Sequence, residues 1–330
     1  MLKETKRKLT EIGIILIIIT ITYILHLKQE FYSLHILSLM GIYILLVLGL
    51  NVVIGNTGLL DLGFMAFYAI GAYSAALLAI RGLQFWIILP ISILITGIFR
   101  FLLGKPLMRL RGDYLAIVTL GFGEITRLIL NNWDYLTNGP KGLPRVGEKI
   151  QPITLFNFTF TEEIHYFYLI LFFAIGSILA IRRIERSKIG RAFVAIREDE
   201  VAAEVSGINT SSIKLFSFVA SSIFAAIAGA IYVHWIGFVS PESFTFWESV
   251  FLVCMVVLGG MGNLLGIVFG VVLLVGTPEF LRLTLGGEFV LYRMLIFGLL
   301  MVILVVVRPQ GIFPEKRRVL ELVGSEEVME

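Results

Sequence analysis

The chain has 330 residues, of which 58% are hydrophobic, and its mean hydropathy is +0.92. Soluble domains are about 45–50% apolar, so this composition excludes a soluble globular protein and predicts an integral membrane protein. The net charge of +3 gives no indication of a nucleic-acid partner, and a single cysteine, Cys254, excludes a disulfide or a cysteine metal site within the chain.

Basic residues are concentrated in four clusters. The clusters hold 18 of the 27 Lys and Arg residues, at 3–8, 100–111, 182–197 and 308–318. Because Lys and Arg are enriched in the cytosolic loops of membrane proteins, we expect all four clusters, and with them both termini, in the cytosol. The first apolar run ends in His-Leu-Lys-Gln at 26–29, without a small-residue cleavage site, so it is predicted to be a transmembrane helix and not a signal peptide.

The first half of the chain is predicted to form helices that are interrupted once by glycines. A helix covers about residues 9–27, and a second ends near residue 54. The uncharged run Gly55-Asn56-Thr57-Gly58 follows, so we expect a glycine-interrupted pair of spans or a re-entrant segment over residues 51–80. A helix over about 85–103 then leads to the second basic cluster.

The second half continues with a span over about 114–130 and a long loop, residues 131–164, which we expect outside the cell membrane. Spans over about 165–181 and 213–236 flank a polar segment, residues 182–212, which we expect in the cytosol.

The last apolar region, residues 247–281, is too long for one span and is interrupted by Gly259-Gly260-Met261-Gly262-Asn263. A final span covers about 288–307. Ten crossings place all four basic clusters on one side, and eight crossings with two re-entrant hairpins do so equally well. The sequence thus predicts an all-α polytopic membrane protein with about 8–10 transmembrane helices.

Two interrupted segments, residues 51–80 and 247–281, lie in different halves of the chain. Broken helices in corresponding positions are typical of transporters with inverted repeats, where they line the path. A possible inverted repeat is therefore one interpretation, and close helix packing through glycine is the other.

The polar segment 182–212 has the spacing of an amphipathic helix. Its apolar residues follow i, i+4, i+7 twice, at Ile189, Phe193 and Ile196 and again at Val201, Val205 and Ile208. Gly207 is predicted to end the helix, and Asn209, Thr210 or Ser211 to cap the next one. Such a helix needs the membrane surface or another protein to cover its apolar face. The alternative is a solvated loop whose arginines fix the topology.

Ionisable and polar residues within the spans are candidates for the transport path, because each is unfavourable in the bilayer. Glu124 and Arg127 share one helix face and can form a structural ion pair, whereas Asp61 has no partner nearby in the sequence and can cap a helix or face the path. The candidate path residues are Asn56, Asp61, Glu124, Arg127 and Asn263.

The sequence lacks the motifs of nucleotide-binding loops and of zinc proteases. There is no G-x-x-x-x-G-K-[ST] and no H-E-x-x-H, so we expect no ATP hydrolysis, no catalytic residue, no metal site and no cofactor in this chain. Energy for transport must then come from a partner or a gradient. An ion-coupled secondary transporter and an intramembrane enzyme are the alternative classes.

Several segments resemble one family. They are LNVVIGNTGLLDLGFMAFYAIGAYSAALL from Leu50, RLRGDYLAIVTLGFGEITRLIL from Arg109, NGPKGL from Asn138, GRAFVAIREDEVAAEVSGIN from Gly190, HWIGFVSPESFTFWESV from His234, VVLGGMGNLLG from Val256 and RPQGIF from Arg308. In order and in sequence they are similar to the M-type permease subunits of branched-chain amino acid ABC importers. The general importer motif, EAA followed by three residues and Gly, is matched by Ala202, Ala203 and Gly207, but Val201 stands in place of the leading Glu.

The resemblance implies one transmembrane permease domain over residues 1–330 of a protein in the inner (cytoplasmic) membrane. Its expected partners are an H-type permease, two ATPase subunits that bind ATP and Mg²⁺, and an extracytoplasmic solute-binding protein. It also implies a coupling helix that docks on the ATPase, with the residues Arg197, Glu198, Asp199, Glu200, Val201, Ala202, Ala203, Glu204 and Gly207. Contact with the binding protein is expected at Gly139, Pro140, Lys141, Gly142, Pro241 and Glu242.

Overall fold

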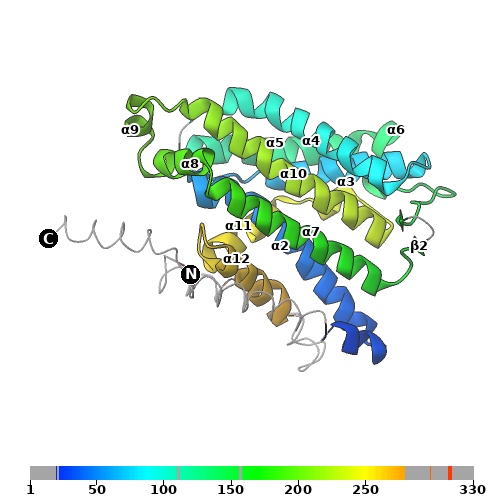
Figure 1. Ribbon diagram of the computed structural model, residues 1–330. Coiled ribbons are helices and arrows are strands. Elements are labelled where there is room, and N and C mark those ends of the chain that lie inside the picture. Colours follow the sequence, from blue (N-terminus) through cyan, green and yellow to red (C-terminus); the bar gives the residue numbers. More distant parts are fainter. Residues whose placement is uncertain are drawn as a thin grey trace.

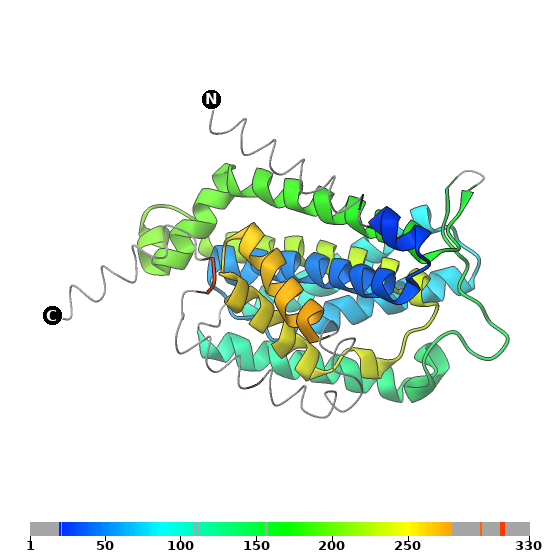
Figure 2. The ribbon, with the colours of Figure 1, turned by 90° about the horizontal axis from the view of Figure 1, so that it is seen from below.

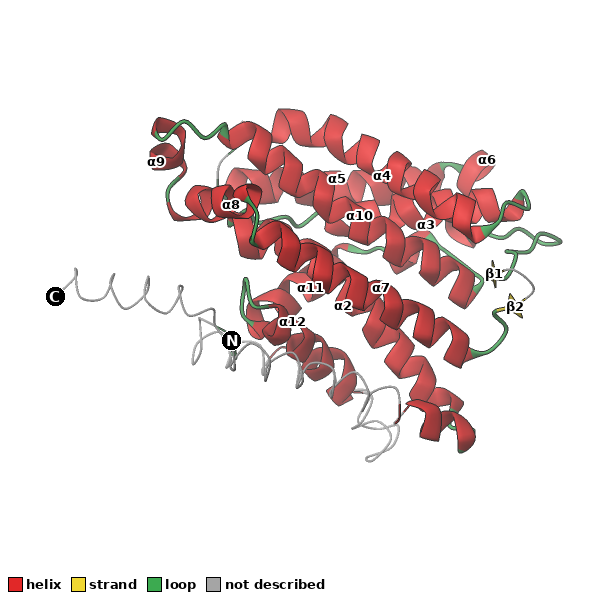
Figure 3. Ribbon diagram, in the orientation of Figure 1, coloured by secondary structure: helices red, strands yellow, loops and turns green. Residues whose placement is uncertain are grey.

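The computed structural model describes residues 20, 22–108, 110, 112–155, 158–278, 298 and 311–313. Of the predicted first span, 9–27, these residues include 20 and 22–27, and of the predicted last span, 288–307, they include only 298. Within the described part nearly all regular structure is helical, which confirms the predicted fold class (Figure 3). Among the described residues, five helices are long and apolar enough to cross a membrane, and two shorter apolar helices accompany them.

The elements follow one another as a succession of long and short helices. In chain order they are α2 (Phe31–Thr57), α3 (Phe64–Ile80), α4 (Phe85–Leu107), α5 (Asp113–Asn132), α6 (Asp134–Thr137), the 3-10 turn η1 (Gly139–Lys141), β1 (Thr154–Leu155), β2 (Phe158–Thr159), α7 (Glu163–Glu185), α8 (Lys188–Glu198), α9 (Glu200–Val205), α10 (Thr210–Ile236), the 3-10 turn η2 (Pro241–Ser243), α11 (Phe246–Gly259), α12 (Leu264–Val271) and the π-helical turn η3 (Val272–Gly276).

The long helices form one bundle with two distinct ends. The short helices α8 and α9 lie at one end, and α6 with the antiparallel β1–β2 hairpin lies at the other (Figure 1). We call these the α8–α9 end and the hairpin end. Figure 2 shows α7 (green) and α5 (teal) on opposite sides of the bundle, with α2 (blue) between them. The predicted loop 131–164 thus supplies the hairpin end, and the polar segment 182–212 supplies the other.

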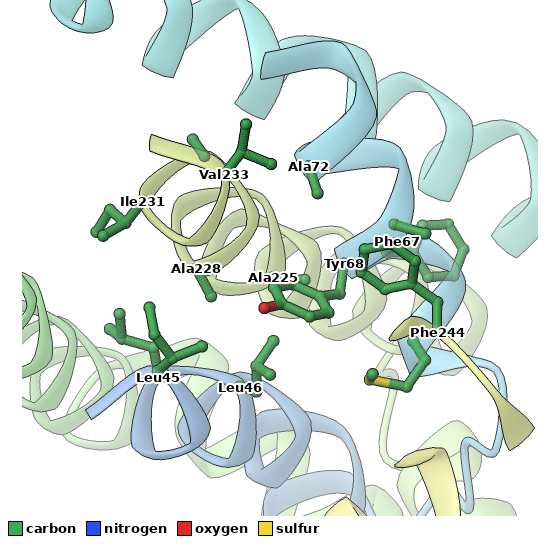
Figure 4. Packing of buried hydrophobic residues seen from close by; sticks show 14 of the residues in the cluster. Leu45, Leu46, Phe67, Tyr68, Ala72, Ala225, Ala228, Ile231, Val233 and Phe244 are labelled. Carbon is green, nitrogen blue, oxygen red and sulfur yellow. The ribbon is translucent and has the colours of Figure 1, made fainter. Parts of the chain in front are cut away.

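The core of the bundle is built where α10 packs against α2 and α3. Leu45 and Leu46 point from α2 toward Ala225 and Ala228 of α10 (Figure 4). A Cβ atom on Gly229 of α10 would lie 2.6 Å from a backbone nitrogen of α3, so only glycine permits this approach. Membrane helices associate through such small residues, which explains the glycines of the sequence by close packing.

Both predicted interruptions are present, although α2 continues three residues beyond the expected end. Gly58 ends it in the left-handed region with φ 70°, and residues 58–63 are irregular before α3 begins. The second interruption, residues 260–263, is a turn between α11 and α12, and its Gly262 N–H donates to Asn51 Oδ1 of α2 over 3.0 Å.

That contact places both interruptions at the α8–α9 end. A two-fold axis in the membrane plane would exchange the two ends of the bundle. Such an axis would have to pass close to both interruptions to relate them, and the correspondence of residues 51–80 with 247–281 stays a prediction.

Candidate functional site

The predicted amphipathic helix of the polar segment is two helices, and the first of them is anchored. Ser187 caps α8 by accepting the Ile189 and Gly190 N–H groups. The apolar stripe of α8 is buried as predicted, but its partner is this chain itself. Phe193 is fully buried and packs with Leu48 of α2 and Ile181 of α7. Neither the membrane surface nor another protein is needed to cover α8.

The second helix, α9, turns its apolar residues outward. Asp199 adopts an extended conformation that ends α8, and its side chain caps α9 by accepting the Val201 and Ala202 N–H groups over 2.8 and 3.0 Å. Val201 is 56% exposed and Val205 is 85% exposed. Gly207 follows with φ 86°, and Asn209 caps α10 by accepting the Ser212 N–H over 3.0 Å, so both predicted helix boundaries are confirmed.

Charged contacts fix the α8–α9 junction to the bundle on two sides. Arg197 Nη1 donates to the Gly55 carbonyl near the end of α2 over 2.7 Å. The Glu200 carboxylate forms an ion pair of 2.5 Å with Lys214 of α10, whose ammonium is almost fully buried.

The nine predicted docking residues therefore divide into two groups. Arg197 and Glu200 face the bundle, and Ala203 is buried. The remaining residues are exposed to solvent; they are Glu198, Asp199, Val201, Ala202, Glu204 and Gly207.

A buried ion pair occupies the first interruption. Asp61 is fully buried, accepts the Gly63 N–H over 3.0 Å and pairs with Arg100 of α4. The Arg100 side chain lies over the rings of Phe67 and Phe218, at 4.1 and 4.2 Å from their centroids. Arg100 is counted in the basic cluster 100–111 that we expect in the cytosol, but its side chain lies in the protein interior. Its position inside the predicted span 85–103 was the signal, because an ionisable residue within a span needs a partner.

Glu124 and Arg127 form the predicted ion pair near the hairpin end. Arg127 Nε donates to Glu124 over 3.0 Å, and its Nη1 lies 3.5 Å from Glu242 of η2. This chain of charges joins α5 to the segment before α11. The two acidic candidates for the path thus have different partners: Asp61 pairs with Arg100, and Glu124 pairs with Arg127.

The two predicted asparagines make structural contacts. Asn263 caps α12 by accepting the Leu265 N–H over 3.1 Å, and it donates to the Phe313 carbonyl over 2.9 Å. Asn56 is buried, and its Nδ2 donates to Glu185 of α7 over 3.4 Å.

The two predicted contact segments for a binding protein meet at the hairpin end. Leu143 and Val239 exchange both backbone hydrogen bonds, over 2.8 and 2.9 Å, which brings residues 139–142 beside residues 241–242. A Cβ atom on Gly142 would lie 2.3 Å from the Val239 carbonyl oxygen. Pro140, Lys141 and Glu242 are exposed on this surface, whereas Gly139, Gly142 and Pro241 are buried and support it.

Two cavities in the described part of the chain lie beside α5. A narrow void with no room for a water molecule lies beside Leu62, Glu124 and Phe246, between the first interruption and α5. A groove of about 400 Å³ between α3, α4 and α5 has an almost wholly apolar lining and contains none of the five candidate path residues. Within the described residues, no three His, Cys, Asp or Glu side chains gather into a metal site.

Comparison with known proteins gives one consistent result. Residues 32–305 match the family described as branched-chain amino acid transport system, permease component. The chain is 43% identical to the high-affinity branched-chain amino acid transport system permease protein LivM of Salmonella typhimurium, over 88% of this chain and 72% of the relative. It is 28% identical to BraD of Pseudomonas aeruginosa, a permease protein of the same kind of system, over 84% of this chain and 94% of the relative.

A further relative is the permease protein LivH of Salmonella typhimurium, which is 26% identical over 84% of this chain and 93% of its own length. No solved structure matches the chain at a significant level.

Proposed function

Because this chain belongs to the family of permease components of branched-chain amino acid transport systems, we propose that it forms part of the path by which these amino acids enter the cell through an ABC importer. The chain is a transport protein and not an enzyme. The similarity to both LivM and LivH supports a partnership with a second, H-type permease. The ion-coupled alternative has no support among these relatives.

The observation that carries the ATP-driven mechanism is the outward face of α9. Val201 and Val205 are exposed there, beside the acidic residues Glu198 and Glu204. An apolar stripe on a short helix is the form that a partner groove recognises. The proposed partner at this site is one of two ATPase subunits, which bind ATP and Mg²⁺.

Charge supports a cytosolic position for the α8–α9 end of a protein in the inner membrane. The last turn of α7 and the beginning of α8 contain the basic residues Arg182, Arg183, Arg186, Lys188 and Arg191. By the positive-inside rule we propose that this end lies in the cytosol together with both termini. The hairpin end then faces outward, where Pro140, Lys141 and Glu242 form a surface suited to a solute-binding protein.

The proposed cycle is alternating access, driven from the α8–α9 end. Closure of the ATPase dimer displaces α9, and α8 follows because the two helices share one junction. The displacement reaches the end of α2 through the hydrogen bond from Arg197 to the Gly55 carbonyl, and it reaches α10 through the ion pair of Glu200 with Lys214. In this proposal the path runs between the first interruption and α5 and is closed here, where the void beside Glu124 has no room for a water molecule.

The test is a charge placed on the outward face of α9 in the assembled importer. Val205→Asp should reduce co-purification of the ATPase subunits and ATP-dependent leucine uptake into proteoliposomes, since a desolvated carboxylate at an apolar contact costs about 2 kcal/mol or more, or roughly thirtyfold in affinity. Val146→Asp, at a fully exposed valine near the hairpin end, is the matched control. Undiminished assembly and uptake in Val205→Asp would contradict docking on α9.

A further inference from the structure

The ion pair between Asp61 and Arg100 is not needed to explain the stability of the bundle. Arg100 is 1% exposed and Asp61 is 0% exposed. Removing two charges from water is unfavourable, and apolar residues of similar volume often stabilise a protein core equally well. Arg100 lies seven residues before the end of α4, about 10 Å into the helix at 1.5 Å per residue. A pair at this depth therefore requires an explanation other than stability.

Arg100 joins three elements at once. One terminal nitrogen donates to Asp61 in the first interruption, and Nε donates to the Phe218 carbonyl of α10 over 3.2 Å. The guanidinium plane is held between Phe67 of α3 and Phe218. A guanidinium can bind two acceptors in different directions, whereas a lysine ammonium is a single point charge.

The same face of α10 also carries the contact with α9. Lys214, Phe218 and Ser221 are spaced i, i+4, i+7 and therefore lie in one row along the helix. Lys214 pairs with Glu200 of α9, and Arg100 contacts Phe218 and reaches toward Ser221. The α9 contact and the Arg100 contact are about one helical turn apart, or 5.4 Å along α10.

Beyond Arg100 the connection continues into the first interruption and α5. Asp61 holds the interruption by accepting the Gly63 N–H, and the neighbouring Leu62 N–H donates to Thr119 of α5 over 3.1 Å. A Cβ atom on Gly63 would lie 2.1 Å from the Thr119 carbonyl oxygen, so the interruption sits directly against α5. Leu62 also lines the narrow void beside Glu124.

We infer that Arg100 and Asp61 are positioning residues of the transport cycle, which fix the interruption between α2 and α3 to α10 so that a displacement of α9 reaches the closed path beside α5. This inference rests on the proposed docking of an ATPase on α9. In this inference the pair connects the interruption mechanically to α10, and neither residue contacts the solute.

The test is Arg100→Lys in the complete importer, reconstituted with its permease partner, ATPases and binding protein. Lysine keeps the positive charge beside Asp61 but has no second nitrogen at the place from which Arg100 Nε donates to the Phe218 carbonyl. Assembly and ATP hydrolysis should stay near the unmodified level, while leucine taken up per ATP hydrolysed falls about tenfold, within the usual range for coupling between sites. Arg81→Lys, at an exposed arginine at the far end of α3, is the matched control and should leave the ratio unchanged.

A second variant covers the case in which Arg100→Lys fails to assemble. The double substitution Asp61→Leu with Arg100→Met removes both buried charges, keeps similar volumes and should assemble, yet it should show the same loss of uptake per ATP.

Three results would overturn the inference. Two of them are an unchanged amount of leucine taken up per ATP hydrolysed, in Arg100→Lys or in the double variant. The third is failure of both variants to assemble, which would show that the pair is needed for folding. The failure of the proposed function is distinguishable, because the unmodified chain would then show no ATP-dependent uptake.

Discussion

The helices α8 and α9 are neighbours with the same apolar spacing and opposite environments. Phe193 and Ile196 of α8 are buried against the bundle, whereas Val201 and Val205 of α9 face solvent. The difference arises at Asp199, whose extended backbone ends one helix and whose side chain begins the next. An apolar stripe therefore shows that a helix face is suited to burial, but only the three-dimensional structure shows whether the chain itself buries it.

The largest expected effect on stability comes from a substitution that removes the buried contact of α8 with the bundle. Phe193→Ala removes a fully buried aromatic ring from the contact with α2 and α7 and should lower the free energy of unfolding by about 3–5 kcal/mol. Thermal unfolding of the purified permease should show the loss. Val201→Ala on α9 is the control and should leave the transition unchanged within about 0.5 kcal/mol, because surface substitutions have small effects. Equal destabilisation by the two variants would contradict the difference between α8 and α9.

A smaller effect should separate two acidic residues of α9. Glu200→Gln leaves the buried Lys214 ammonium without its charged partner and should destabilise the permease by about 1–3 kcal/mol. Glu204→Gln, at an exposed position, should leave stability unchanged and affect only the affinity for the ATPase. Thermal unfolding without partners, followed by ATPase co-purification, measures both properties. If Glu204→Gln destabilised the isolated permease as much as Glu200→Gln, the inward and outward assignments would be wrong.

Local sequence patterns were sufficient to predict part of the fold and part of the candidate site. The spacing of Phe193 and Ile196 predicted a buried helix face, and Gly207 and Asn209 predicted the boundaries between α9 and α10. The glycine runs predicted both interruptions. These features depend on residues that are close in sequence, so helical periodicity and capping preferences are enough to reveal them.

Contacts between residues that are distant in the sequence could not be predicted in the same way. Arg197 meets the Gly55 carbonyl 142 positions away, and Arg100 meets Asp61 39 positions away. Nothing in the spacing of one helix encodes a partner on another. For that reason Glu200 and Glu204 looked equivalent in the sequence, and Arg100 was counted in a basic cluster expected in the cytosol and not as a residue of the protein interior.

The central claim is that α9 lies in the cytosol and is covered there by an ATPase subunit. The most direct measurement is labelling of Val205→Cys, in a Cys254→Ala background, with a membrane-impermeant thiol reagent in sealed vesicles of both orientations. Val146→Cys at the hairpin end serves as the reference for the opposite side. The account predicts labelling of Val205→Cys only from the cytosolic side, and protection when the ATPase subunits are added. Labelling from the outer side, or full labelling in the assembled importer, would contradict it.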